Sequence, residues 1–91
     1  MRRVVWSDQA LEQLEAITTY VRTDSPVAAA RLEARIVEKA DSLGMMPDRG
    51  RPISRARRVI AVTPTYLLCY GVAGEEVRIL SVRHSARRPE T

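Results

Sequence analysis

Hydrophobic residues follow two different spacings along the chain, and the change between them predicts the order of its elements. The β-branched and aromatic stretch at residues 2–6 indicates a first strand. Residues 8–22 and 26–43 carry apolar side chains at helical spacing, which predicts two amphipathic helices. Because only a few residues separate them, the helices are expected to lie antiparallel as a hairpin.

Residues with a preference for helix ends stand where the helical pattern starts and stops. Ser7 is expected to cap the first helix, and Ser25, followed by Pro26 at the first helical position, is expected to cap the second. Gly44, with Pro47 beyond it, predicts the end of the second helix. The boundaries of the hairpin are therefore indicated independently of its apolar pattern.

Three apolar runs in the last third of the chain predict a meander of antiparallel strands over residues 58–84. Gly74 lies between the last two runs, where its backbone freedom suits a tight turn. The last run is expected to be the central strand of the sheet, with His84 at its end. The predicted fold class is α+β, in the order β-α-α-β-β-β, with the helical hairpin packed on a small, mainly antiparallel sheet.

Length and charge complete the predicted organisation. The chain has 91 residues, enough for a single domain over 1–91 with one modest core. A basic loop is expected at 44–57 and a basic tail at 85–91. The second half carries most of the positive charge, because residues 49–91 hold nine arginines against three glutamates. This asymmetry favours a polyanion or an acidic protein as partner.

Several kinds of chemistry are excluded by composition. One histidine and one cysteine cannot supply a zinc site, and the four glycines do not form a nucleotide-binding loop, so no metal or other cofactor is expected. There is no apolar run of membrane-spanning length and no signal-peptide pattern, so the protein is expected in the cytoplasm and not in a membrane. Arginine, tyrosine and a single histidine remain, which suit binding a phosphate backbone or cleaving RNA without a metal.

Five segments in order resemble the ParE/RelE superfamily of toxins from bacterial type II toxin-antitoxin systems. They are WS near the start, YVRTDSPVAA, PDRGRP, RVIAVTPTYLLCY and the ending VRILSVRHSARR. The resemblance covers nearly the whole chain and implies the fold predicted above. It also implies a cognate antitoxin as partner, which holds the toxin inactive.

The resemblance implies one of two activities. RelE-like members are ribosome-dependent mRNA interferases, and ParE-like members poison DNA gyrase without being nucleases. The RelE-like alternative would use Arg58, His84 and Arg87 as catalytic residues. The ParE-like branch is favoured, because no carboxylate occurs in residues 49–72, no tyrosine follows His84, and the ending HSARR resembles the H-x-x-R of ParE-like chains.

The residues expected to bind the target or the antitoxin are mainly arginines of the basic half. They are Arg51, Arg55, Arg57, Arg58, Tyr66, Arg83, His84, Arg87 and Arg88. A purely structural role is the alternative for several of them. His84 would then do no more than end a strand, Arg51 would tie a loop to the helices, and Tyr66 would be a half-buried sheet residue. A third hypothesis, a non-toxic nucleic-acid-binding module, is disfavoured because no aromatic residue lies beside the arginine clusters.

Overall fold

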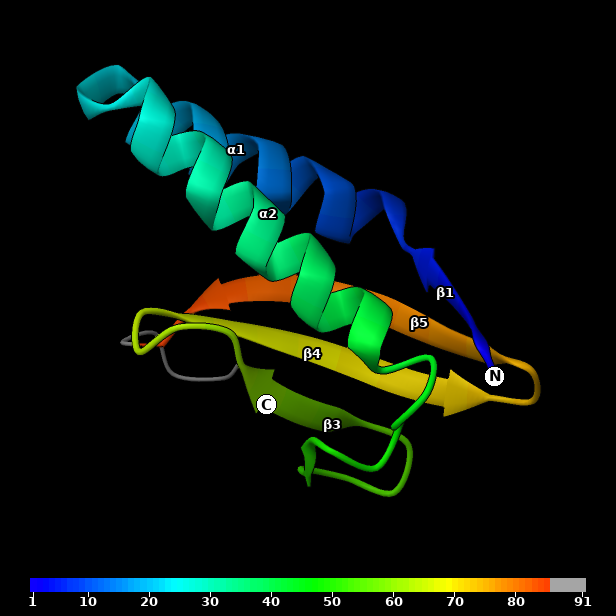
Figure 1. The fold of residues 1–91 in the computed structure, drawn as a ribbon. Helices are drawn as coiled ribbons and strands as arrows, with labels where there is room; N and C mark the ends of the chain where they lie inside the picture. The colour runs from blue at the N-terminus through cyan, green and yellow to red at the C-terminus, as the bar shows by residue number, and fades with distance from the viewer. Residues whose placement is uncertain (86–91) are drawn as a thin grey trace.

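Two helices lie side by side on one face of a five-stranded sheet (Figure 1). The structure is a computed structural model in which residues 1–85 are described. The elements in chain order are β1 (Arg3–Trp6), α1 (Asp8–Asp24), α2 (Pro26–Ser42), β2 (Arg51–Pro52), β3 (Arg58–Ala61), β4 (Tyr66–Ala73) and β5 (Glu76–His84). The predicted fold class is therefore confirmed.

The strands are arranged in the order β1-β5-β4-β3-β2. β1 runs parallel to β5, and the other neighbours are antiparallel. The prediction that the last strand is central is wrong: β4 is central, and β5 lies between it and β1. A second difference is β2, a two-residue strand that pairs with β3 inside the segment expected to be a loop.

The helix caps form as the sequence predicts. The hydroxyl oxygen of Ser7 accepts a hydrogen bond from the Ala10 N–H at 3.0 Å, and that of Ser25 accepts one from the Ala28 N–H at 3.1 Å. The Ser25 N–H also donates to the Val21 carbonyl, so one residue ends α1 and begins α2. α1 extends two residues beyond its predicted end, and α2 ends one residue before it.

Replacing Ser25 with alanine is expected to destabilise the protein by about 1 kcal/mol, because an N–H at the start of α2 loses its acceptor. Thermal unfolding of the purified variant measures the effect. Ser54→Ala is the control, since the side chain of Ser54 is exposed and makes no hydrogen bond with a described residue. Equal losses of stability in both variants would contradict a capping role for Ser25.

Two glycines meet different backbone requirements. Gly74 has a φ of 59°, the left-handed conformation expected for the tight turn between β4 and β5. Gly44 does not have a positive φ, so α2 does not end in a left-handed glycine cap. A Cβ at Gly44 would instead lie 2.6 Å from the carbonyl oxygen of Arg2, and the Arg2 N–H donates to the Gly44 carbonyl. Gly44 thus permits β1 to approach the end of α2.

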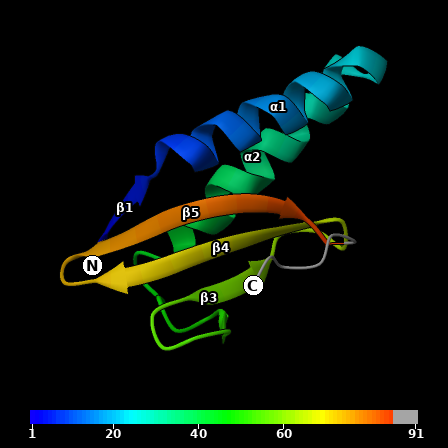
Figure 2. The same ribbon diagram turned by 180° about the vertical axis from the view of Figure 1, so that it is seen from behind.

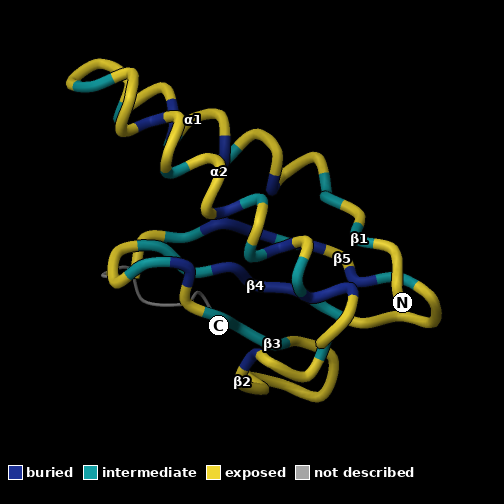
Figure 3. Tube along the Cα trace, in the orientation of Figure 1, coloured by how far each residue is buried: buried dark blue, intermediate teal, exposed yellow. Residues whose placement is uncertain are grey.

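The core lies between the helices and the strands β4 and β5 (Figure 3). Ile36 and Ala40 of α2 are fully buried against this face, together with Leu68 and Tyr70 of β4 and Ile79 of β5. Burial of such side chains supplies most of the free energy that holds the hairpin on the sheet. Within residues 1–85, neither helix has the length and apolar character needed to cross a bilayer.

Candidate target-binding surface

The helices cover only one face of the sheet, and we call the opposite side the open face (Figure 2), although Cys69 and Ser81 on it are buried. Side chains alternate between the two faces along a strand. Leu68 and Tyr70 of β4 belong to the core, so Leu67, Cys69 and Gly71 point to the open face. Their cross-strand partners share that face, which allows the arginines of the sheet to be assigned.

Three arginines of β2 and β5 lie on the open face. The cross-strand pairs that place them are Arg83 with Leu67, Arg78 with Gly71, and Arg51 with Val59, which itself pairs with Cys69. These residues come from β2 and β5, which are separated by two other strands. The sheet therefore collects basic residues that are about 30 positions apart in the sequence.

The loop before β3 adds two further arginines beside this face. A Cβ at Gly71 would lie 3.0 Å from the carbonyl oxygen of Ala56, so the loop passes directly against the open face at Gly71. Arg55 and Arg57 flank Ala56, and both are exposed. Gly71 thus allows the close approach that brings this basic loop to the sheet.

One carboxylate on the open face neutralises part of this charge. Glu76 accepts a hydrogen bond from Arg3 at 2.6 Å and another from Arg78 at 3.2 Å. These two bonds hold the pKa of Glu76 below its ordinary value of 4.5. Arg51 and Arg83, in contrast, form no ion pair with any described residue, so no carboxylate within residues 1–85 neutralises them.

Glu76→Gln is expected to reduce stability only above acidic pH. A lowered folded-state pKa means that the stabilisation is present above the unfolded value of about 4.5 and is lost as pH falls through the folded-state value. The melting temperatures of the two proteins should therefore differ at pH 6 and converge as the pH falls below 4.5 and through the folded-state pKa, and added salt should shrink the difference. A difference that does not change with pH would contradict an ionic role.

Arg58 lies on the helix side of the sheet, although the sequence groups it with Arg55 and Arg57. It pairs across the sheet with Tyr70, a core residue. Its guanidinium donates to the carbonyl oxygens of Gly50 at 2.7 Å and Asp48 at 3.3 Å. Arg58 therefore holds the loop that follows α2, and the predicted basic cluster is divided between two faces.

Tyr66 and His84 are paired at the far end of β4 and β5, also on the helix side. Their rings meet edge to face, with centroids 5.6 Å apart. Ser85 fixes this end, because its N–H donates to the Thr65 carbonyl at 2.6 Å and its hydroxyl to the Pro64 carbonyl at 2.7 Å. Arg87 and Arg88 lie outside the described residues.

The geometry separates Arg58 from His84. Arg58 is opposite Tyr70 and His84 is opposite Tyr66, so the two residues are offset along the strands by four positions of β4. They are also two strands apart, because β4 lies between β3 and β5. At about 3.3 Å per residue and about 4.8 Å per strand, their backbones are roughly 16 Å apart. The two side chains therefore do not meet at one phosphate with Arg58 held in its loop.

The hydroxyl of Tyr70 joins the core of the sheet to the loop that follows α2. It donates to the Pro47 carbonyl at 2.7 Å and accepts from the Gly50 N–H at 2.8 Å. Burial raises the pKa of Tyr70, so the phenol keeps its proton and cannot serve as a base. Among the described residues, no three His, Cys, Asp or Glu side chains gather as a metal site would require.

A helical hairpin on a sheet of this order is the fold of small toxins from toxin-antitoxin systems. The solved structure described as the chromosomal ParDE TA system from P. aeruginosa matches with a TM-score of 0.79 at 24% identity, over 92% of this chain and 96% of that one. The YoeB/ParE toxin from Agrobacterium tumefaciens matches with a TM-score of 0.68 at 19% identity, over 90% and 96% of the two chains.

Sequence comparison places the chain within this class. The family model for the ParE toxin of type II toxin-antitoxin systems, parDE, matches residues 4–89. Toxin RelE2 of Caulobacter vibrioides is 42% identical over 87 residues, which cover 96% of this chain and 99% of that protein. The chain therefore belongs to the ParE toxin family and is the toxin of a type II system. Because the family model carries the name ParE and the relative the name RelE, the choice of cellular target rests on the chemistry of the site.

Proposed function

We propose that the protein arrests bacterial growth by poisoning DNA gyrase and that a cognate antitoxin neutralises it. The observation that carries the proposal is the open face, where Arg51 and Arg83 have no described carboxylate partner and the loop arginines lie beside them. Guanidinium groups bind phosphate oxygens with short, charge-assisted hydrogen bonds. The DNA held by gyrase is the polyanion that this surface would contact, and the site of action is then the cytoplasm.

The same geometry favours binding over cleavage. RNA cleavage without a metal needs a base and an acid within hydrogen-bond reach of the reacting ribose and phosphate. Glu76 is a poor base because its pKa is lowered, and Arg58 is occupied by the carbonyls of its loop. Under this proposal the protein is not itself a nuclease, and the open-face arginines supply affinity for the target.

Ribosome-dependent mRNA cleavage is the second candidate. His84 is exposed at the end of β5 beside Tyr66, and the 42% identical relative is named Toxin RelE2. In this alternative His84 would act as acid or base, with Arg87 as its cationic partner. A binding module without toxicity is the third, and it would leave growth unaffected.

Induced expression in bacteria, with and without the adjacent gene, separates the three candidates. The DNA damage response and the integrity of messenger RNA are read in the same samples. Gyrase poisoning predicts growth arrest with an induced damage response and intact transcripts, all reversed by the adjacent gene. Transcript cleavage that depends on translation would overturn the gyrase proposal in favour of the second candidate. Normal growth with folded protein would overturn both toxin mechanisms.

A further inference from the structure

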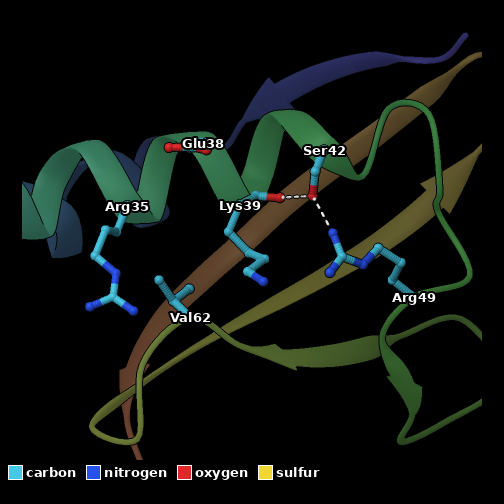
Figure 4. Close-up of a pocket in the computed structure, with 6 residues that line it drawn as sticks. All are labelled: Arg35, Glu38, Lys39, Ser42, Arg49 and Val62. Carbon is cyan, nitrogen blue, oxygen red and sulfur yellow. Dashed lines mark hydrogen bonds between the residues drawn. The ribbon is translucent and has the colours of Figure 1, made fainter.

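A pocket of about 250 Å³ lies beside α2 on the helix side of the sheet, away from the open face (Figure 4). It is bounded by α2, by the loop that follows α2, and by the residue after β3. The residues that line it are Arg35, Glu38, Lys39, Ser42, Arg49 and Val62. None of these residues belongs to the candidate target-binding surface.

Three cationic side chains converge on this pocket. Arg35 and Lys39 are one turn apart on α2 and extend from the helix on either side of Val62, while Arg49 reaches in from the loop (Figure 4). None of the three forms an ion pair with a described residue. The carboxylate of Glu38 lies away from the three cationic groups in the same view, so it does not neutralise them. The pocket is therefore positively charged.

The position of Arg49 is fixed by hydrogen bonds. Its guanidinium donates to the Ser42 hydroxyl oxygen at 3.2 Å, and that hydroxyl donates to the Lys39 carbonyl at 2.6 Å. The loop itself is held by Tyr70 and Arg58, which bond its backbone on either side of Arg49. Arg49 therefore needs little further ordering when an anion binds.

We infer that this pocket binds a carboxylate side chain from an acidic segment of the antitoxin. The inference rests on the proposed function, which supplies the antitoxin. Guanidinium and ammonium groups match a carboxylate in charge and hydrogen-bonding geometry. Buried Val62 gives the pocket an apolar wall for the side-chain stem of Asp or Glu.

The surroundings favour a peptide over nucleic acid as the occupant. A nucleic acid carries a continuous row of phosphates and is best bound by an extended basic track. This site is a single recess lined by three cationic side chains, which suits one carboxylate better than a row of phosphates. The net charge of +4 on the toxin adds attraction for an acidic partner.

The test measures the affinity of the purified toxin for the protein encoded by the adjacent gene. In the test variant, Arg35 and Lys39 are both replaced by glutamine. In the control variant, Arg22→Gln and Arg31→Gln make the same charge change on exposed helix positions that do not line the pocket. The test variant is expected to bind at least tenfold more weakly, and the control less than twofold. Melting curves of both variants verify that they are folded.

A second substitution is expected to change the affinity for the antitoxin in the opposite direction. Glu38→Gln removes a negative charge from the lining and is expected to raise the affinity by up to fivefold, and a loss of affinity would count against an anion in the pocket. Equal affinities for the test and control variants would overturn the inference while leaving the toxin function intact. Failure of the wild-type protein to bind the adjacent gene product would instead overturn the proposed function and the inference with it.

A further experiment tests whether nucleic acid, instead of the antitoxin, occupies the pocket. Binding of a 20-nucleotide DNA duplex is measured with the same two variants. If the Arg35→Gln/Lys39→Gln variant loses affinity for DNA but binds the antitoxin normally, the pocket is a phosphate site and the carboxylate assignment is wrong. If it binds DNA as the control does and loses the antitoxin, the assignment is supported.

Discussion

Replacing Arg51 and Arg83 together with glutamine is expected to abolish growth arrest. Each guanidinium is free of described carboxylate partners and can form a charge-assisted contact with phosphate, which is worth about 1.5 kcal/mol or more. Loss of both should weaken target binding by about 100-fold. Colony counts after induced expression measure the effect, and the melting temperature should hardly change because neither side chain supports the core.

The Arg22→Gln/Arg31→Gln variant serves as the control for this experiment too. It removes the same charge from the helices, away from the open face. We expect it to arrest growth as the wild type does. Full toxicity of the Arg51→Gln/Arg83→Gln variant at equal expression would show that the open face does not bind the target.

Tyr70→Phe is expected to cause a large loss of stability, about 3 kcal/mol. The phenol hydroxyl both donates to the Pro47 carbonyl and accepts from the Gly50 N–H, and its removal leaves two backbone groups without partners. For a chain of this length the melting temperature should fall by about 15 °C. Thermal unfolding followed by circular dichroism measures it.

Tyr66→Phe provides a matched comparison. Tyr66 is half-buried on the same strand, its hydroxyl makes no hydrogen bond with a described residue, and phenylalanine keeps the ring that contacts His84. Its stability is expected to stay within about 0.5 kcal/mol of the wild type. If both variants melt alike, the Tyr70 hydroxyl does not anchor the loop.

The sequence predicts those features of the fold that local chemistry decides. The caps at Ser7 and Ser25, the helical spacing and the turn at Gly74 each act within a few residues, and all are present in the structure. The order of the strands depends instead on pairing between distant segments. The parallel contact of β1 with β5 places β5 second in the sheet, and no local pattern in β5 indicates this.

Which arginines share a face of the sheet also depends on pairing between distant segments. Arg57 and Arg58 are adjacent in sequence, yet Arg58 is taken to the helix side by its register opposite Tyr70. The register of β5 is also shifted between its pairs with Cys69 and Tyr70, which decides the face on which Arg83 lies. Charge density alone shows where arginines gather in the sequence, whereas the register assigns them to a face.

The pocket at Arg35, Lys39 and Arg49 is predicted only in part by the sequence. The spacing of Arg35 and Lys39 predicts that they share a side of α2. Nothing in the sequence predicts that Arg49 joins them, because its position depends on the bonds that Tyr70 and Arg58 make to the loop.

The most direct test of gyrase as the target uses purified gyrase, plasmid DNA, ATP and the purified toxin, with cleaved DNA trapped on gyrase as the readout. Gyrase poisoning through the open face predicts that cleaved plasmid accumulates with the wild type and with the Arg22→Gln/Arg31→Gln variant, but not with the Arg51→Gln/Arg83→Gln variant. The absence of cleaved DNA with wild-type toxin that arrests growth in cells would contradict gyrase as the target.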